Sequence, residues 1–127
     1  MLYEHRGFTE SHTLLIDVTK YGGGRDIEEK LEKANILVNR NLLPYDIKMG
    51  RHYTNPGGVR LGVQELTRLG MGMSEMVHIA DLIKRVIADN VPAEKIREEV
   101  AELRRGFQKV HYAFSSQREA YEYIRVR

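Results

Sequence analysis

The apolar residues of this chain follow two different patterns on either side of Val91. Before that residue, short apolar runs alternate with glycine-rich turns and two helical patterns. After it, apolar residues recur at helical spacing. Short runs bounded by turns are typical of buried strands, and recurrence every three or four residues is typical of amphipathic helices. The sequence therefore predicts an α+β fold: a small sheet of about three strands covered by helices, with a helical C-terminal extension.

Three segments have the pattern of strands, residues 13–18, 35–39 and 58–63. Each is short and largely apolar, as the strands of a small sheet are. Residues 42–57 show no periodicity, which predicts a long loop between the second and third strands. Loops of that length inside a compact domain often carry function.

Helical spacing predicts three helices and a capping box predicts a fourth. The first begins near Asp26 and runs for about three turns. Its apolar residues are Ile27, Leu31 and Ala34. The second begins around Ser74, with an apolar face made of Met76, Ile79, Ala80, Ile83, Val86 and Ile87. The third begins at Pro92, whose missing N–H is harmless at a first helical position. Its apolar seam consists of Ile96, Val100, Leu103, Phe107 and Val110. Ser116 and Glu119 form the capping box of the last helix.

The length of 127 residues corresponds to one ordinary domain. We expect a single domain over residues 1–127, with an α/β part at 1–90 and the helical extension at 91–127. No run approaches the ~20 apolar residues of a membrane span, and no signal peptide is visible at the N-terminus. The chain has no cysteine, which excludes disulfides and is compatible with a cytoplasmic location. A net charge of +2 gives no reason to expect a nucleic acid or a membrane as a partner.

Arg60 is the most informative candidate for binding. Side chains along residues 58–63 alternate between the two faces of a sheet. The apolar set, which we expect against the helices, consists of Val59, Leu61 and Val63. Arg60 falls on the opposite face, between Gly58 and Gly62, where neighbouring side chains are missing. An arginine in such a hollow has its guanidinium free for a bidentate contact with a carboxylate or phosphate. An arginine paired with a structural acid, or simply solvated, is the alternative.

Other features carry weaker chemistry. The run Gly22-Gly23-Gly24 precedes a helix but lacks the spacing of a phosphate-binding loop, so a flexible turn is the better interpretation. The five histidines show no paired spacing, and no metal site is predicted. Basic residues of the C-terminal half alternate with acids, which is typical of a solvated helix face rather than of a nucleic-acid site.

Three longer motifs occur in a fixed order. Residues 12–18 read His-Thr-Leu-Leu-Ile-Asp-Val, and residues 34–46 read Ala-Asn-Ile-Leu-Val-Asn-Arg-Asn-Leu-Leu-Pro-Tyr-Asp. Residues 58–62 read Gly-Val-Arg-Leu-Gly and are followed by Thr-Arg-Leu-Gly-Met at 67–71. In letters, order and gaps these motifs resemble the C-terminal small domain of serine hydroxymethyltransferase. The resemblance runs from about Thr9 to Ile87.

The resemblance implies a fold-type I pyridoxal-phosphate enzyme, a homodimer that moves a one-carbon unit between serine and a reduced pterin and gives glycine. It implies that Arg60 binds the carboxylate of the amino acid, a role that strand alternation indicates independently. It also implies that Asn41 lies near the pterin ring. An amide donates to and accepts from heteroaromatic rings, so this chemistry is reasonable. An asparagine that caps a turn is the alternative at Asn41.

The chain departs from the common family pattern after the third strand. The family's Gly-Thr-Pro-Ala is replaced by Gly62-Val63-Gln64-Glu65, and Leu69 stands where the family has arginine. Gln64 and Glu65 look more like archaeal members, which leaves open whether the co-substrate is tetrahydrofolate or a modified pterin. From Val91 onward the chain resembles the common form poorly.

By the same resemblance, the lysine that forms a Schiff base with pyridoxal phosphate belongs to a large domain outside these residues. No lysine of this chain sits in the threonine-rich motif that would supply it. We therefore expect a domain that is inactive alone, with the missing large domain and serine or glycine as its partners. The alternative is a stand-alone helical interaction or oligomerisation module, in which an exposed seam at residues 96–110 binds a partner.

Overall fold

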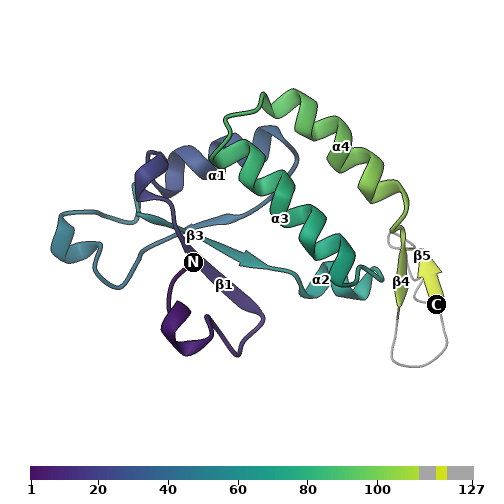
Figure 1. Cartoon of the computed structure of the whole chain (residues 1–127), viewed down its shortest axis with the longest axis horizontal. Coiled ribbons are helices and arrows are strands. Elements are labelled where there is room, and N and C mark those ends of the chain that lie inside the picture. The colour runs from purple at the N-terminus through teal and green to yellow at the C-terminus, as the bar shows by residue number, and fades with distance from the viewer. Residues whose placement is uncertain (112–116, 120–127) are drawn as a thin grey trace, which may run out of the picture.

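A three-stranded antiparallel sheet lies beneath a layer of helices in the computed structural model, which describes residues 1–111 and 117–119 (Figure 1). The strands are β1 (Thr13–Asp17), β2 (Asn39–Asn41), β3 (Gly58–Gly62), β4 (Lys109–His111) and β5 (Gln117–Glu119). The α-helices are α1 (Gly24–Lys33), α2 (Gln64–Arg68), α3 (Met73–Ile87) and α4 (Ala93–Arg105). Short 3-10 helices occupy Glu4–Arg6, Thr19–Tyr21 and Ile47–Met49. The predicted α+β class and the sheet of three strands covered by helices are confirmed.

Strand β3 lies in the centre of the sheet, between β1 and β2. Both neighbours run antiparallel to it, with Leu15 opposite Arg60 on one side and Asn39 opposite Arg60 on the other. Directly paired residues of an antiparallel ladder share a face, so this register decides which side chains gather around Arg60. The candidate arginine therefore lies at the middle of the sheet.

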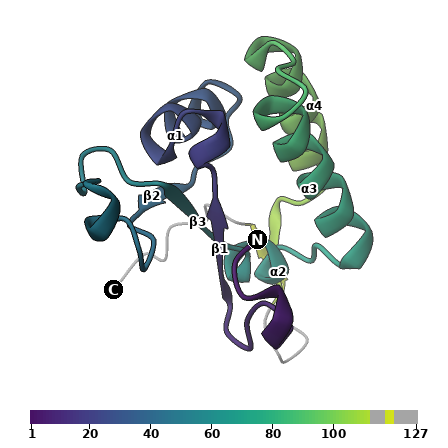
Figure 2. The same ribbon diagram turned by 60° about the vertical axis from the view of Figure 1, so that its left-hand side comes forward.

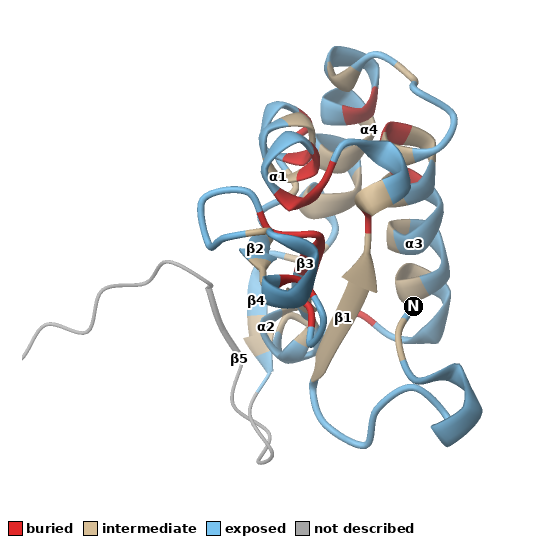
Figure 3. Cartoon of the chain, turned by 90° about the vertical axis from the view of Figure 1, so that its left-hand side faces the viewer, coloured by how far each residue is buried: buried red, intermediate tan, exposed pale blue. Residues whose placement is uncertain are grey.

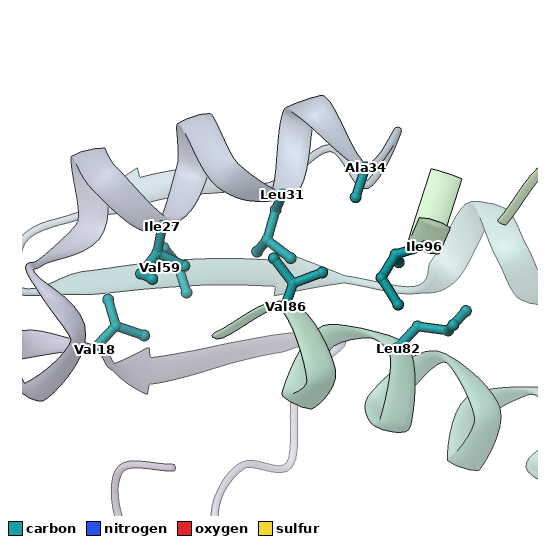
Figure 4. Packing of buried hydrophobic residues seen from close by; sticks show 8 residues of the cluster. All are labelled: Val18, Ile27, Leu31, Ala34, Val59, Leu82, Val86 and Ile96. Atoms are coloured by element: carbon teal, nitrogen blue, oxygen red, sulfur yellow. The ribbon is translucent and has the colours of Figure 1, made fainter. Parts of the chain in front are cut away.

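The core forms where α1 crosses β3. Ile27 and Leu31 point from α1 toward Val59 of β3, and all three are fully buried (Figure 4). Burial of aliphatic side chains of this size stabilises the fold by about 1.5–3 kcal/mol each. Ala34, one turn beyond Leu31, is also fully buried. The spacing predicted for the first helix is thus confirmed, although the helix begins at Gly24.

Helices α3 and α4 complete the core. In Figure 2 they run together on one flank while α1 lies on the other. Leu82 and Val86 are the buried residues of α3, so the core face of this helix is centred on a leucine that the predicted face omitted. Ala80, which was predicted for that face, is exposed. Arg85 of α3 binds Glu99 of α4. Its Nη1 and Nη2 each donate to one carboxylate oxygen of Glu99 at 2.6 Å, and this pair joins the two helices.

The predicted apolar seam of the third helix is internal. Ile96 of α4 is fully buried, and Val100 and Leu103 pack against the same core cluster (Figures 3 and 4). An interaction module would need this seam exposed to a partner. These residues instead pack α4 against the rest of the chain. The structure therefore gives no support to an interaction module that binds a partner through this seam.

The chain after Val91 is not wholly helical. Pro92 is the N-cap rather than the first residue of α4, which ends at Arg105. Val110, placed on the helical seam by its spacing, lies in β4, which pairs with β5. Val110 keeps the helical spacing of apolar residues by chance, because only a short turn separates the end of α4 from β4. Ser116 of the predicted capping box lies outside the described residues, and Glu119 lies in β5 rather than in a helix.

The second strand begins later than its apolar run. Asn35 adopts φ +60° directly after α1, a left-handed conformation that asparagine tolerates. Ile36 and Val38 then pack against the core without joining the ladder, while Leu37 is 83% exposed. Strand β2 therefore occupies 39–41 instead of 35–39, because its pairing with β3 starts only opposite Arg60.

Candidate functional site

The sheet presents one face away from the helices, and we call it the open face. The register assigns to it every second residue of each strand. These residues are Thr13, Leu15, Asp17, Asn39, Asn41, Gly58, Arg60 and Gly62. Arg60 is the only cationic residue among them, and both predicted binding residues, Arg60 and Asn41, lie on this face. Figure 2 shows the sheet beneath α1 from the side.

Arg60 is exposed, and its guanidinium has one partner among the described residues. Its Nη2 donates to Oδ1 of Asn39 at 3.3 Å, across the pair of strands. No carboxylate of the described residues lies within ion-pair distance of it. The structural-acid interpretation therefore has no support in this part of the chain. A guanidinium offers five N–H donors in a fixed fork, so most of them remain available to a ligand.

The sequence predicted an empty hollow at the glycines beside Arg60. The structure shows that these spaces are occupied. A Cβ atom on Gly58 would lie 2.4 Å from Cδ2 of Leu43. A Cβ atom on Gly62 would lie 2.7 Å from Oε1 and 3.3 Å from Nε2 of Gln64. The two spaces are thus filled by side chains from outside the strand. Arg60 thus lies on β3 between two glycines, one covered by the apolar side chain of Leu43 and the other by the amide of Gln64. We call these two side chains the walls of the Arg60 site.

Asn41 of β2 lies opposite Gly58, two pairs along the ladder from Asn39 and Arg60 and on the same face of the sheet. Its Nδ2 donates to the carbonyl oxygen of Leu42 at 2.7 Å. The amide is thus engaged with its own chain through the nitrogen, in the manner of a turn-capping asparagine. Its Oδ1 has no hydrogen bond to any described residue, so the oxygen remains an acceptor on the open face.

The loop at residues 42–57 is held closed by Asp46, which is fully buried. Oδ2 of Asp46 accepts hydrogen bonds from the backbone N–H of Leu43 at 2.8 Å and of Gly57 at 2.6 Å. The two ends of the loop are thereby joined through one carboxylate oxygen. Among the described residues, Oδ1 of Asp46 has no partner. This arrangement places Leu43 over Gly58, and thus beside Arg60.

A second contact ties the loop to the end of β1. The hydroxyl of Tyr45 donates to Oδ2 of Asp17 at 2.5 Å, and the hydroxyl and N–H of Thr19 donate to Oδ1. Burial alone would raise the pKa of Asp17, but these hydrogen bonds and the charge of Arg51 lower it overall. The bond to Asp17, together with burial, raises the pKa of Tyr45 to about 12. The pair is therefore a neutral phenol on a carboxylate at neutral pH.

The triple glycine allows the start of α1 to lie against β3. Gly22 and Gly23 have φ of +110° and +111°, which residues with a side chain rarely adopt. A Cβ atom on Gly24 would lie 2.2 Å from the carbonyl oxygen of Gly58. Its N–H donates to the carbonyl of Pro56 at 2.7 Å. The glycines thus serve close packing, and neither a phosphate loop nor a merely flexible turn describes them.

Sequence reasoning missed three residues around Arg60. Asn39 appears in the second motif, but it was assigned to a strand without a role. Gln64 was noted only as a departure from the family, since nothing in a linear pattern shows that a side chain turns back over a neighbouring glycine. Asp46 had one usable signal, because an aspartate in a turn or loop often accepts from backbone N–H groups.

Among residues 1–111, no three histidine or acidic side chains come together as metal ligands. In the same residues no helix is long and apolar enough to cross a bilayer. A shallow hollow of about 160 Å³ lies between the N-terminal segment and β1, lined by Phe8 and Leu15 among others. It does not include Arg60 or Asn41.

Comparison with known proteins identifies close relatives. The family model described as serine hydroxymethyltransferase matches residues 5–83. The chain is 50% identical over its whole length to a serine hydroxymethyltransferase of Cenarchaeum symbiosum, of which it covers 29%. It is 57% identical over 94% of its length to one from Korarchaeum cryptofilum and 54% identical over 99% to one from Methanopyrus kandleri, covering 27% and 29% of those proteins. The chain therefore spans less than a third of the length of these relatives.

Proposed function

This chain belongs to the serine hydroxymethyltransferase family, and we propose that it acts as the small C-terminal domain of such an enzyme, binding the carboxylate of the amino-acid substrate through Arg60. The reaction that we propose for the whole protein moves a one-carbon unit between serine and a reduced pterin. The exposed guanidinium of Arg60, with no carboxylate of the described residues beside it, is the observation that supports this role most directly.

The chemistry of the site suits a small carboxylate. The hydrogen bond from Nη2 to Asn39 uses one donor and limits rotation of the guanidinium plane. The remaining donors can bind both oxygens of a carboxylate in a charge-assisted, bidentate contact. Leu43, which is buried, covers the neighbouring Gly58 and makes that side of the site apolar.

Asn41 is proposed as a contact to the pterin. Its Nδ2 is engaged by Leu42, so its free Oδ1 would accept a hydrogen bond from an N–H of the ring. The residue lies on the same face as Arg60, two pairs along the ladder, opposite Gly58. The two substrates would thus bind side by side along β3.

The described residues do not fit pyridoxal phosphate, which the family as a whole uses. The open face carries no lysine, and its one cation is Arg60. The groups that would hold this cofactor therefore belong to the large domain that we propose as the partner of this chain. We derive no catalytic step from the residues described here. The chain alone should catalyse no exchange between serine and glycine.

The test uses the full-length protein that contains this segment. We expect Arg60→Ala to weaken glycine binding by about 2–5 kcal/mol, roughly 30-fold to several thousand-fold in Kd, because the ligand carboxylate loses its counter-charge. Isothermal calorimetry with glycine measures Kd directly. The matched control is Arg25→Ala, which removes an exposed arginine that pairs only with Glu29 on α1. Glycine affinity that is equal in the two variants would overturn the assignment.

A further inference from the structure

We propose that Gln64 is a second ligand-binding group of the Arg60 site, donating from its side-chain amide to the same amino-acid carboxylate. This inference rests on the proposed function, because it assumes that Arg60 binds that carboxylate. It adds a specificity-determining residue at the position where the chain departs from the common family pattern. Three features of the structure support it.

The first feature is the direction in which the amide points. The Cβ position of Gly62 projects to the open face, as the side chain of Arg60 does, because the two residues are separated by two positions on β3. Oε1 of Gln64 lies 2.7 Å from that position and Nε2 lies 3.3 Å from it. The amide of Gln64 therefore takes the place of the missing side chain of Gly62. It stands on the open face, next to Arg60.

The second feature is the rigid backbone beneath the amide. Gln64 is the first residue of α2, and Val63 is its N-cap. The carbonyl of Val63 accepts from both the N–H and the hydroxyl of Thr67, at 3.0 and 3.2 Å. The junction between strand and helix is thus fixed by hydrogen bonds. A side chain on a fixed backbone loses less entropy when it binds a ligand.

The third feature is that the amide remains available. Within residues 1–111, it has no hydrogen-bond partner, and Gln64 is exposed. Arg60 and Gly62 are about 7 Å apart along the strand, which the long arginine side chain spans. A single carboxylate placed between them can accept from the guanidinium with one edge and from Nε2 of Gln64 with its remaining lone pairs.

The position also identifies which substrate Gln64 contacts. Along β3, Gly58 lies beside Asn41 on one side of Arg60, and Gly62 lies beside Gln64 on the other side. A pterin that contacts Asn41 would therefore lie away from Gln64. The amide faces the amino acid, so its removal should alter amino-acid affinity and leave pterin affinity unchanged.

Two variants of the full-length protein test this proposal. Gln64→Leu keeps the bulk over Gly62 and removes the donor, so we expect glycine to bind about tenfold to a hundredfold more weakly, as for loss of a hydrogen bond to a charged group. Gln64→Glu places a negative charge beside the carboxylate and should weaken binding further. The control Asn90→Asp makes the same amide-to-acid change in the exposed turn between α3 and α4 and should leave Kd unchanged.

Calorimetry with glycine gives Kd for each variant, calorimetry with the reduced pterin gives the second affinity, and thermal unfolding reports whether each variant is folded. The double variant Arg60→Ala with Gln64→Leu decides whether both residues act on one carboxylate, because each substitution removes a donor and neither introduces a negative charge. If they do, the two losses should not add.

The outcomes separate the two claims. If Arg60→Ala weakens glycine binding but both Gln64 variants bind as the wild type does, the inference about Gln64 is wrong and the role of Arg60 stands. If Gln64→Leu weakens pterin binding instead, the amide contacts the other substrate and the inference is also wrong. If Arg60→Ala itself has no effect, the proposed function fails first.

Discussion

Asp46 is the residue on which the loop at residues 42–57 depends. Its Oδ2 accepts from two backbone N–H groups in a fully buried position. We expect Asp46→Ala to lower the free energy of unfolding by about 2–4 kcal/mol, because both N–H groups lose their acceptor. Urea unfolding measures the change. Asp89→Asn removes only an exposed pair with Lys84 at 3.6 Å and should stay within about 1 kcal/mol of the wild type.

The hydroxyl of Tyr45 should ionise at a higher pH than an ordinary tyrosine hydroxyl, because it donates a hydrogen bond to the Asp17 carboxylate. Its folded pKa of about 12 lies above the value of about 10 for an unfolded tyrosine. The stabilisation is therefore complete below pH 10 and is lost as pH rises through about 12. The same hydrogen bond also loses its stabilising effect at acid pH, because protonation removes the charge of the Asp17 carboxylate. Since the pKa of Asp17 is lowered in the folded protein, this loss occurs as pH falls through that lowered pKa.

Phenolate absorbance during a pH titration checks this prediction. One of the seven tyrosines should ionise near pH 12, and that component should be missing in Tyr45→Phe. The variant should lose roughly 1 kcal/mol of stability at pH 7, since the hydroxyl is partly exposed. Loss of a phenolate component near pH 10 instead of near pH 12 in the variant would show that the bond to Asp17 does not form.

For single residues, the sequence predicted the face of the sheet on which Arg60 lies, but not the side chains that surround it. Alternation along a strand follows from backbone geometry alone, so the face of Arg60 could be predicted without a partner strand. The contents of the hollow could not be predicted. Leu43 and Gln64 reach Gly58 and Gly62 from a loop and a helix start, and such contacts depend on folding of the chain rather than on local pattern.

At the scale of elements, α1 lies close against β3 at Gly24. We expect Gly24→Ala to destabilise the protein by at least about 1–3 kcal/mol, because the new methyl group would meet the carbonyl oxygen of Gly58 at 2.2 Å. Gly106→Ala is the matched control. Gly106 has φ −73°, and its nearest neighbour would be the carbonyl of Leu103 at 3.6 Å, so this variant should be neutral or slightly more stable. Thermal unfolding of the two variants measures the difference.

The elements that were predicted well are those whose apolar residues face one layer. Helix α1 has Ile27, Leu31 and Ala34 at regular spacing, and all three are buried. Periodicity failed where an apolar residue serves the core from an irregular segment. Val38 packs against the core before β2 begins, and Val110 continues the period of α4 although it belongs to β4. The spacing of apolar residues alone could not reveal either error, because Val38 and Val110 fit the expected pattern of the element to which they were predicted to belong.

For the molecule as a whole, Ile96 connects α4 to a core that also contains residues of α1, α3 and β3. Ile96→Ala should lower the free energy of unfolding by about 2–5 kcal/mol, since the cavity it leaves lies among fully buried neighbours. If α4 belongs to the same cooperative unit as the sheet, unfolding should remain a single transition by circular dichroism and by tyrosine fluorescence. Two separate transitions would show that α4 unfolds independently of the sheet.

The two walls of the Arg60 site come from segments that can change without altering the strand beneath them. Gly58 and Gly62 contribute backbone only, while the chemistry on either side is supplied from positions 43 and 64. A descendant of this chain could therefore exchange an apolar neighbour for a polar one, or an amide for a hydroxyl, and keep every ladder hydrogen bond of β3. If Arg60 binds substrate as we propose, single substitutions at positions 43 and 64 would change the substrate preference of the site and leave Arg60 in place.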